Sequence, residues 1–161
     1  MTIKIGDRLP DVRVTVMGES GPTPASSGEL FKGKTVALFG VPGAFTPTCS
    51  EQHLPGFLAN ADALKAKGVT TIACTAVNDA FVLNAWSKER GANGIITMLA
   101  DGNGEFAEAV GLDVDLSPFG LGVRSKRYAM VVEDGVVKYL AVEDSPPAHE
   151  KATAEKVLAF F

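Results

Sequence analysis

The chain has 161 residues, of which 46% are hydrophobic and 21% are charged. A chain of this length buries roughly 68–70% of its unfolded surface, so we expect one compact domain over residues 1–161. The net charge of −4 gives no reason to expect nucleic acid or an anionic membrane as a partner, and no apolar run approaches the ~20 residues of a membrane-spanning helix.

Cysteine usage and the first residues both favour a cytoplasmic location. The chain contains two cysteines, Cys49 and Cys74, which are too few for a disulfide framework. The opening run MTIKIGDRLPDV has no apolar segment of the kind that a signal peptide needs. We therefore expect the protein to work in the reducing cytoplasm.

The first part of the chain predicts two strands. Apolar and polar positions alternate over residues 12–16, which indicates a half-buried edge strand. Residues 18–28 are rich in glycine, proline and serine and predict a surface loop. Residues 35–41 are almost wholly apolar and end at Pro42-Gly43, so they predict a buried strand stopped by a turn.

Helical and extended patterns then alternate along the chain. Apolar residues recur at helical spacing over 54–64, Gly68 closes that helix, and Pro55 predicts a kink near its start. The patterns that follow predict a strand over 69–77, a helix capped by Asn78 or Asp79 and stopped at Gly91, a strand over 95–100 and a short helix over 105–110.

The end of the chain decides the fold class. Two strands, 128–133 and 136–142, flank Asp134-Gly135, which is a strong hairpin signal, and an apolar stripe predicts a helix over 154–161. A doubly wound nucleotide-binding fold would keep alternating strand and helix to the end. The chain therefore predicts an α/β, thioredoxin-like fold: a mixed central sheet flanked by helices, with an N-terminal β extension.

Cys49 lies where a helix follows a buried strand. A helix N-terminus offers unpaired N–H groups and a partial positive charge, which favour a thiolate over a thiol. The alternative is a small buried hydrophobe, which is the usual role of a free cysteine. We expect Cys49 to be a nucleophile and Cys74, in the middle of a predicted strand, to be a packing residue.

The residues around Cys49 match a known signature. Pro42, Thr46 and Cys49 have the spacing Pro-x3-Thr-x2-Cys, within the run VPGAFTPTCSEQHLPGF. Two more runs, ACTAVNDAFVLNAW and DLSPFGLGVRSKRYAMVVEDGVV, extend the match from about residue 6 to residue 142. The chain resembles the peroxiredoxins of type II, or class five, the atypical subfamily. That resemblance implies a thiol peroxidase for hydrogen peroxide and organic hydroperoxides, a homodimer, and an antioxidant role with neither metal nor organic cofactor.

The resemblance also implies a role for each matched residue. Cys49 would attack a peroxide oxygen and become a sulfenic acid. Thr46 would hydrogen-bond the peroxide and the thiolate, Pro42 would shield the sulfur, and Arg127 would supply the positive charge. Because side chains alternate along a strand, Arg124 would face away from the site if both arginines lay in one strand.

Three further residues, His53, Leu116 and Phe119, are candidates of lower weight. His53 lies one helical turn after Cys49 and either packs in the core or contributes to the electrostatics of the site. His149 is expected to be exposed. By resemblance Leu116 and Phe119 form a hydrophobic collar or a dimer contact; the alternative is that Phe119 is a core aromatic residue.

The way in which the sulfenic acid is reduced depends on the second thiol. Residues 142–161 contain no cysteine, which departs from subfamily members with a late resolving cysteine. Helix and strand rises place Cys49 and Cys74 about 12 Å apart, beyond the ~7 Å reach of a disulfide. We therefore expect a one-cysteine cycle in which glutathione, glutaredoxin or thioredoxin reduces Cys49, although local unfolding could bring Cys74 to it.

Three other functions fit parts of the pattern. A thiol–disulfide oxidoreductase would need a C-x-x-C pair, which the residues after Cys49 do not provide. A redox sensor or holdase would use Cys49 without turnover. A phosphate-binding module would need a glycine-rich loop and an adjacent lysine. The peroxidase hypothesis explains the most residues.

Overall fold

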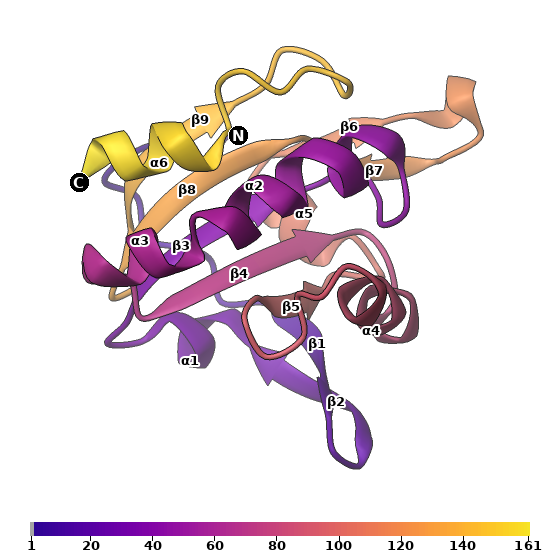
Figure 1. The fold of residues 1–161 in the computed structure, drawn as a ribbon. Helices are drawn as coiled ribbons and strands as arrows, with labels where there is room; N and C mark the ends of the chain where they lie inside the picture. Colours follow the sequence, from indigo (N-terminus) through magenta and orange to yellow (C-terminus); the bar gives the residue numbers. More distant parts are fainter. Residues whose placement is uncertain (1) are drawn as a thin grey trace.

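The computed structural model describes residues 2–161 as a mixed sheet with helices on both faces (Figure 1). The strands are β1 (Arg13–Gly18), β2 (Gly21–Ser26), β3 (Thr35–Gly40), β4 (Thr71–Ala76), β5 (Thr97–Ala100), β6 (Asp113–Asp115), β7 (Val123–Ser125), β8 (Tyr128–Glu133) and β9 (Val136–Val142). The helices are α1 (Ser27–Phe31), α2 (Leu54–Ala59), α3 (Ala61–Ala66), α4 (Ala80–Glu89), α5 (Glu105–Ala109) and α6 (Ala154–Phe160), with a π-helical turn η1 (Cys49–His53) and a 3-10 turn η2 (Ser117–Phe119).

Seven strands form the central sheet in the order β2-β1-β5-β4-β3-β8-β9. The inner strands β5, β4 and β3 are parallel, whereas β8 pairs antiparallel with β3 and the hairpin partner β9 pairs antiparallel with β8. The mixed sheet and the late hairpin are those that the sequence predicts. β6 and β7 form a separate two-stranded ribbon.

The predictions for residues 12–28 are wrong in two respects. The expected surface loop contains β2, and because β2 pairs with β1 along its whole length, β1 is not an edge strand. Pro22 and Pro24 lack the N–H that an inner strand needs, so the sequence argues against a strand here. β2 lies at the sheet edge, where proline is tolerated. β1 and β2 together form the N-terminal β extension.

The sheet separates two hydrophobic cores. Along β3, Ala37 and Phe39 point into one core and Val36 and Leu38 into the other, because successive side chains of a strand face opposite ways. The first core is covered by α2, α3, α4 and α6, and the second by α1 and α5 (Figure 1). Cys49 lies in the first core.

The helix that carries Cys49 follows directly from β3. It starts at Pro47, passes through η1 and continues as α2, so Cys49 lies in its first turn. The wide turn η1 immediately precedes Pro55, close to the kink that the sequence predicts. A second interruption at Asn60 divides the predicted helix into α2 and α3.

The start of β8 is fixed by a close approach between two residues. A Cβ at Gly40 would overlap the ring of Tyr128, its partner across the β3–β8 ladder, so only glycine fits there. Burial raises the pKa of the Tyr128 hydroxyl. Tyr128 faces the second core, and the residue before it, Arg127, reaches the first.

Two general features bear on function. No helix within residues 2–161 combines the length and the apolar character that crossing a membrane requires. In the same part of the chain, no three histidine, cysteine or acidic side chains come together as ligands for a metal ion.

Candidate active site

Cys49 is completely buried below a loop that links β3 to its helix. The turn that follows β4 holds this loop, because the Ala44 N–H donates to Asn78 Oδ1 at 2.9 Å. Phe45 adopts a φ of 65°, a left-handed conformation that non-glycine residues rarely take. Strain of this kind persists only where the surroundings hold the backbone firmly, which indicates a rigid wall above Cys49.

Thr46 uses its hydroxyl proton within the loop. Its Oγ1 donates to the carbonyl oxygen of Gly43 at 2.7 Å. A hydroxyl has one proton and two lone pairs, so toward the pocket the Thr46 oxygen can only accept a hydrogen bond. The resemblance implies that the Thr46 hydroxyl donates a hydrogen bond to the Cys49 thiolate. In this arrangement it cannot, because its proton is already donated to Gly43.

Arg127 contacts the cysteine sulfur directly. Its Nη2 donates to Cys49 Sγ at 3.1 Å, and its Nε and Nη2 both donate to the carbonyl oxygen of Pro146, at 3.2 and 3.1 Å. The residue is only 2% exposed. Hydrogen bonds from a guanidinium are strengthened by its charge, and here the planar group is held on several sides at once.

His53 is held between Arg127 and the end of the chain. Its Nδ1 lies 3.0 Å from Arg127 Nη1, and its Nε2 lies 2.8 Å from the carbonyl oxygen of Ala152. Arginine can only donate and a carbonyl can only accept, so Nδ1 must be bare and Nε2 must carry the proton. Burial, and then the charge of Arg127, hold the pKa of His53 well below its usual range. His53 is thus a neutral part of the site.

The neutral state of His53 makes stability depend on pH. The pKa of His53 in the folded protein lies below the unfolded value of about 6.5. Below about pH 6.5 the unfolded chain therefore binds a proton that the folded protein does not, and the stability that neutral His53 provides above this pH is progressively lost. We expect the free energy of unfolding to fall between about pH 7.5 and 5.5, and to fall less in His53→Gln. Urea unfolding at both pH values measures this slope. His149, whose pKa burial also lowers, contributes to the slope that remains. Equal slopes in the two proteins would contradict the assignment.

His149 does not lie where the sequence places it, and the condition for separating the two arginines is not met. Arg127 follows β7 rather than lying in it, so strand alternation does not separate the two arginines. Arg124 Nη1 instead donates to the carbonyl oxygen of Pro42 at 3.2 Å and supports the same loop. His149 is half-buried rather than exposed, with its ring centroid 5.1 Å from that of His53.

A largely apolar pocket of about 460 Å³ opens beside the cysteine. Leu116 is buried at its wall, whereas Phe119 is 74% exposed at the rim, so Phe119 is not a core residue. Leu116 and Phe119 both line this pocket. The lining consists of Pro42, Thr46, Pro47, Thr48, Leu116, Phe119, Leu121, Arg127, Pro146 and Pro147.

Several groups of this site have no signature in the sequence. The carbonyl oxygens of Pro146 and Ala152 come from an irregular segment, and any residue would carry such an oxygen. Arg127 and His53 are buried polar side chains that require hydrogen-bond acceptors, and this requirement is the only hint that such carbonyl oxygens lie nearby.

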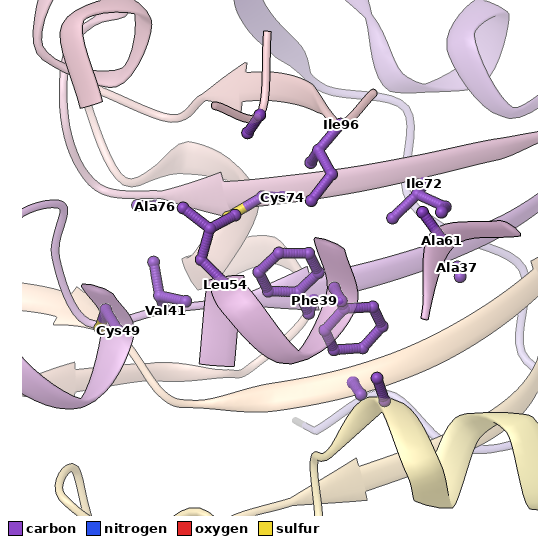
Figure 2. Close-up of a cluster of buried hydrophobic side chains, with 14 of the residues drawn as sticks. Ala37, Phe39, Val41, Cys49, Leu54, Ala61, Ile72, Cys74, Ala76 and Ile96 are labelled. Atoms are coloured by element: carbon purple, nitrogen blue, oxygen red, sulfur yellow. The ribbon is translucent and has the colours of Figure 1, made fainter. Parts of the chain in front are cut away.

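Cys74 occupies the same core but has a different environment. It lies in β4, and both cysteines are free and buried. Figure 2 shows them at separate places in the core, with Val41 between them in this view. Burial, and then the nearby Cys49, raise the pKa of the Cys74 thiol well above its usual range. Both the burial and the raised pKa disfavour the thiolate, which is the reactive form of a cysteine.

Comparisons with known proteins place this site in a family. The Redoxin family model matches residues 4–158. The chain is 47% identical to peroxiredoxin-2E, chloroplastic, of Arabidopsis thaliana, over 98% of this chain and 68% of that protein. The structure of reduced Prx3 from Vibrio vulnificus in complex with hydrogen peroxide matches with a TM-score of 0.93 and 49% identity, covering 98% of each chain.

Peroxiredoxin 5 from Alvinella pompejana has the same fold, with a TM-score of 0.85 and 38% identity over 98% of this chain and 97% of that one. The thioredoxin-like fold that the sequence predicts is thereby confirmed. With its relatives and its fold in agreement, the chain belongs to the Redoxin family and is a peroxiredoxin of the atypical type, an antioxidant enzyme that uses a cysteine thiol to reduce peroxides.

Proposed function

We propose that Cys49 is the peroxidatic thiol and that a separate thiol compound or protein completes its cycle. The Cys49 thiolate attacks the hydroxyl-bearing oxygen of the peroxide, an S–O bond forms and the O–O bond breaks. The products are the Cys49 sulfenic acid and a hydroxide or alkoxide, and the leaving oxygen takes up a proton from the solvent, equivalent to the one that the thiol released on ionising, to become water or an alcohol. The sulfur is oxidised by two electrons and the peroxide is reduced by two.

The charge of Arg127 is the observation that carries this proposal. Its guanidinium is buried, its hydrogen-bond partners besides Cys49 are a neutral histidine and a carbonyl oxygen, and no acidic side chain pairs with it within residues 2–161. A buried cation is costly unless an anion compensates for it. The Cys49 thiolate is the group in contact that can provide that negative charge.

The rest of the pocket suits the other reactant. The Thr46 hydroxyl oxygen can accept a hydrogen bond from the O–H group of the peroxide, which fixes the orientation of the O–O bond. Pro42 and the apolar rim keep bulk water from the sulfur, as expected for a nucleophile that must not be solvated. The open, apolar mouth favours organic hydroperoxides as well as hydrogen peroxide.

The environment of Cys74 supports a one-cysteine cycle. A buried thiol with a raised pKa is a poor nucleophile toward a sulfenic acid. We expect Cys74→Ser to keep peroxide turnover with glutathione and glutaredoxin at the wild-type rate, within about twofold. Coupled NADPH consumption measures this rate, with thioredoxin and its reductase as the parallel reducing system. Loss of turnover in Cys74→Ser with both systems would make Cys74 the resolving cysteine.

We also propose a homodimer and a cytoplasmic location. Phe119 and Val123 expose apolar surface near the pocket rim, which supports a contact between two copies at this end of the molecule. Light scattering of the wild type beside Phe119→Ser tests the dimer, and a single monomeric mass for both contradicts it.

Two free thiols are consistent with a reducing compartment, and imaging of the tagged protein in its own cell tests the location.

A further inference from the structure

Glu143 is a buried carboxylate outside the pocket. It directly follows β9 and is 6% exposed. One of its oxygens, Oε2, accepts hydrogen bonds from three consecutive N–H groups, those of Glu150, Lys151 and Ala152, at 2.9, 2.7 and 2.6 Å. Three donors converging on one oxygen form a site for an anion. The backbone N–H of Glu143 donates to the carbonyl oxygen of Arg127 at 2.9 Å.

The segment that Glu143 ties together, residues 144–152, is here called the return loop. It contains neither helix nor strand. The loop supplies the two carbonyl oxygens that orient the site: Pro146 O accepts from Arg127, and Ala152 O accepts from His53. His149, in the same loop, packs against the His53 ring.

We propose that Glu143 is a positioning residue for peroxide reduction. By gathering the three N–H groups, its carboxylate closes the return loop so that Pro146 O and Ala152 O lie where Arg127 and His53 need them. Arg127 then holds its Nη2 against Cys49 Sγ. This inference rests on the proposed roles of Cys49 and Arg127.

A purely structural role for Glu143 makes a different prediction. If the carboxylate only anchored α6 to the sheet, its loss would lower the free energy of unfolding and leave the chemistry of folded molecules unchanged. If it positions Arg127, folded molecules will hold a less stable Cys49 thiolate. The pH dependence of Cys49 reactivity therefore separates the two roles.

Two substitutions at Glu143 and one beside it make the test. Glu143→Gln keeps the shape but not the charge, whereas Glu143→Asp keeps the charge but withdraws the oxygen from the three N–H groups. Asp144→Asn is the matched control, since Asp144 is the adjacent carboxylate and within residues 2–161 its salt bridge is with the exposed Lys151. Cys49→Ser is run in parallel. Each variant is used at a temperature where circular dichroism shows it to be folded.

The readouts are the rate constant for oxidation by hydrogen peroxide and the pH profile of Cys49 alkylation by iodoacetamide. We expect both Glu143 variants to be oxidised about tenfold more slowly or worse, because small displacements of a positioned group are costly. Their alkylation midpoints will move to higher pH, and Asp144→Asn will match the wild type in both readouts.

The remaining outcomes overturn the proposal in distinguishable ways. Folded Glu143 variants with the wild-type rate and pH profile would overturn the positioning role alone. If the same variants also had a lowered free energy of unfolding, Glu143 would be assigned to stability only. A wild type that reacts no faster than Cys49→Ser would overturn the proposed function, and this inference with it.

Discussion

Replacement of Cys49 by serine is expected to abolish the fast reaction of the reduced protein with peroxide. A serine hydroxyl does not ionise near neutral pH, so Arg127 would face an uncharged group with little nucleophilicity. We expect the rate constant to fall at least about a thousandfold, since removal of a catalytic nucleophile costs as much as about 10⁶ in kcat in a serine protease. Stopped-flow measurement of peroxide consumption gives the rate.

Cys74→Ser is the matched control for this result. It makes the same sulfur-to-oxygen change at the other buried cysteine of the same core, and we expect it to keep the wild-type rate of oxidation. If both variants lost the fast reaction, general disturbance of the core would be the simpler explanation. If Cys49→Ser kept the fast reaction, Cys49 would not be the peroxidatic thiol.

Arg127→Lys is expected to have the second largest effect. Lysine keeps a positive charge but lacks the planar fork that reaches Cys49, His53 and Pro146 together. The lysine ammonium group cannot contact Cys49 and His53 at the same time, as the guanidinium does. Nδ1 of the His53 ring would then be left buried without a hydrogen-bond donor. We expect the rate constant for oxidation to fall about 100-fold, as when one preorganised donor is removed from an active site.

Lys126→Gln is the control for charge near the site. Lys126 is the neighbouring cation and is only half-buried, and its loss changes the net charge without touching the guanidinium contacts. A near-wild-type rate in this variant, beside the large loss in Arg127→Lys, would assign the effect to geometry. Equal rates in the wild type and Arg127→Lys would mean that a diffuse positive charge is sufficient.

The central part of the fold follows closely from local patterns in the sequence. β3, β4 and β8 are apolar runs buried on both faces, and Asp134-Gly135 forms the hairpin turn with φ values of 47° and 81°. β2 could not be predicted in this way, because its pairing with β1 outweighs the low strand propensity of its prolines. The short ribbon of β6 and β7 likewise depends on pairing between distant residues.

The site was predicted best where side chains carry the chemistry. The place of Cys49 at a helix start marks it as a reactive thiol, and the match to the peroxiredoxin signature marks Pro42, Thr46 and Arg127. The structure places Pro42, Thr46 and Arg127 around one pocket, and Arg127 contacts Cys49 Sγ behind it. The shape of the return loop could not be predicted, because its partners are backbone groups brought close only by folding. In particular, nothing in the local sequence distinguishes Glu143 from an exposed acidic residue.

The most direct test of the account is to trap the oxidised cysteine. The reduced protein is treated with one equivalent of hydrogen peroxide in the presence of dimedone, which reacts with sulfenic acids, and peptides are then mapped by mass spectrometry. We expect one adduct, on the peptide that contains Cys49, in both the wild type and Cys74→Ser. An adduct on Cys74, or a Cys49–Cys74 disulfide in place of any adduct, would contradict the proposed cycle.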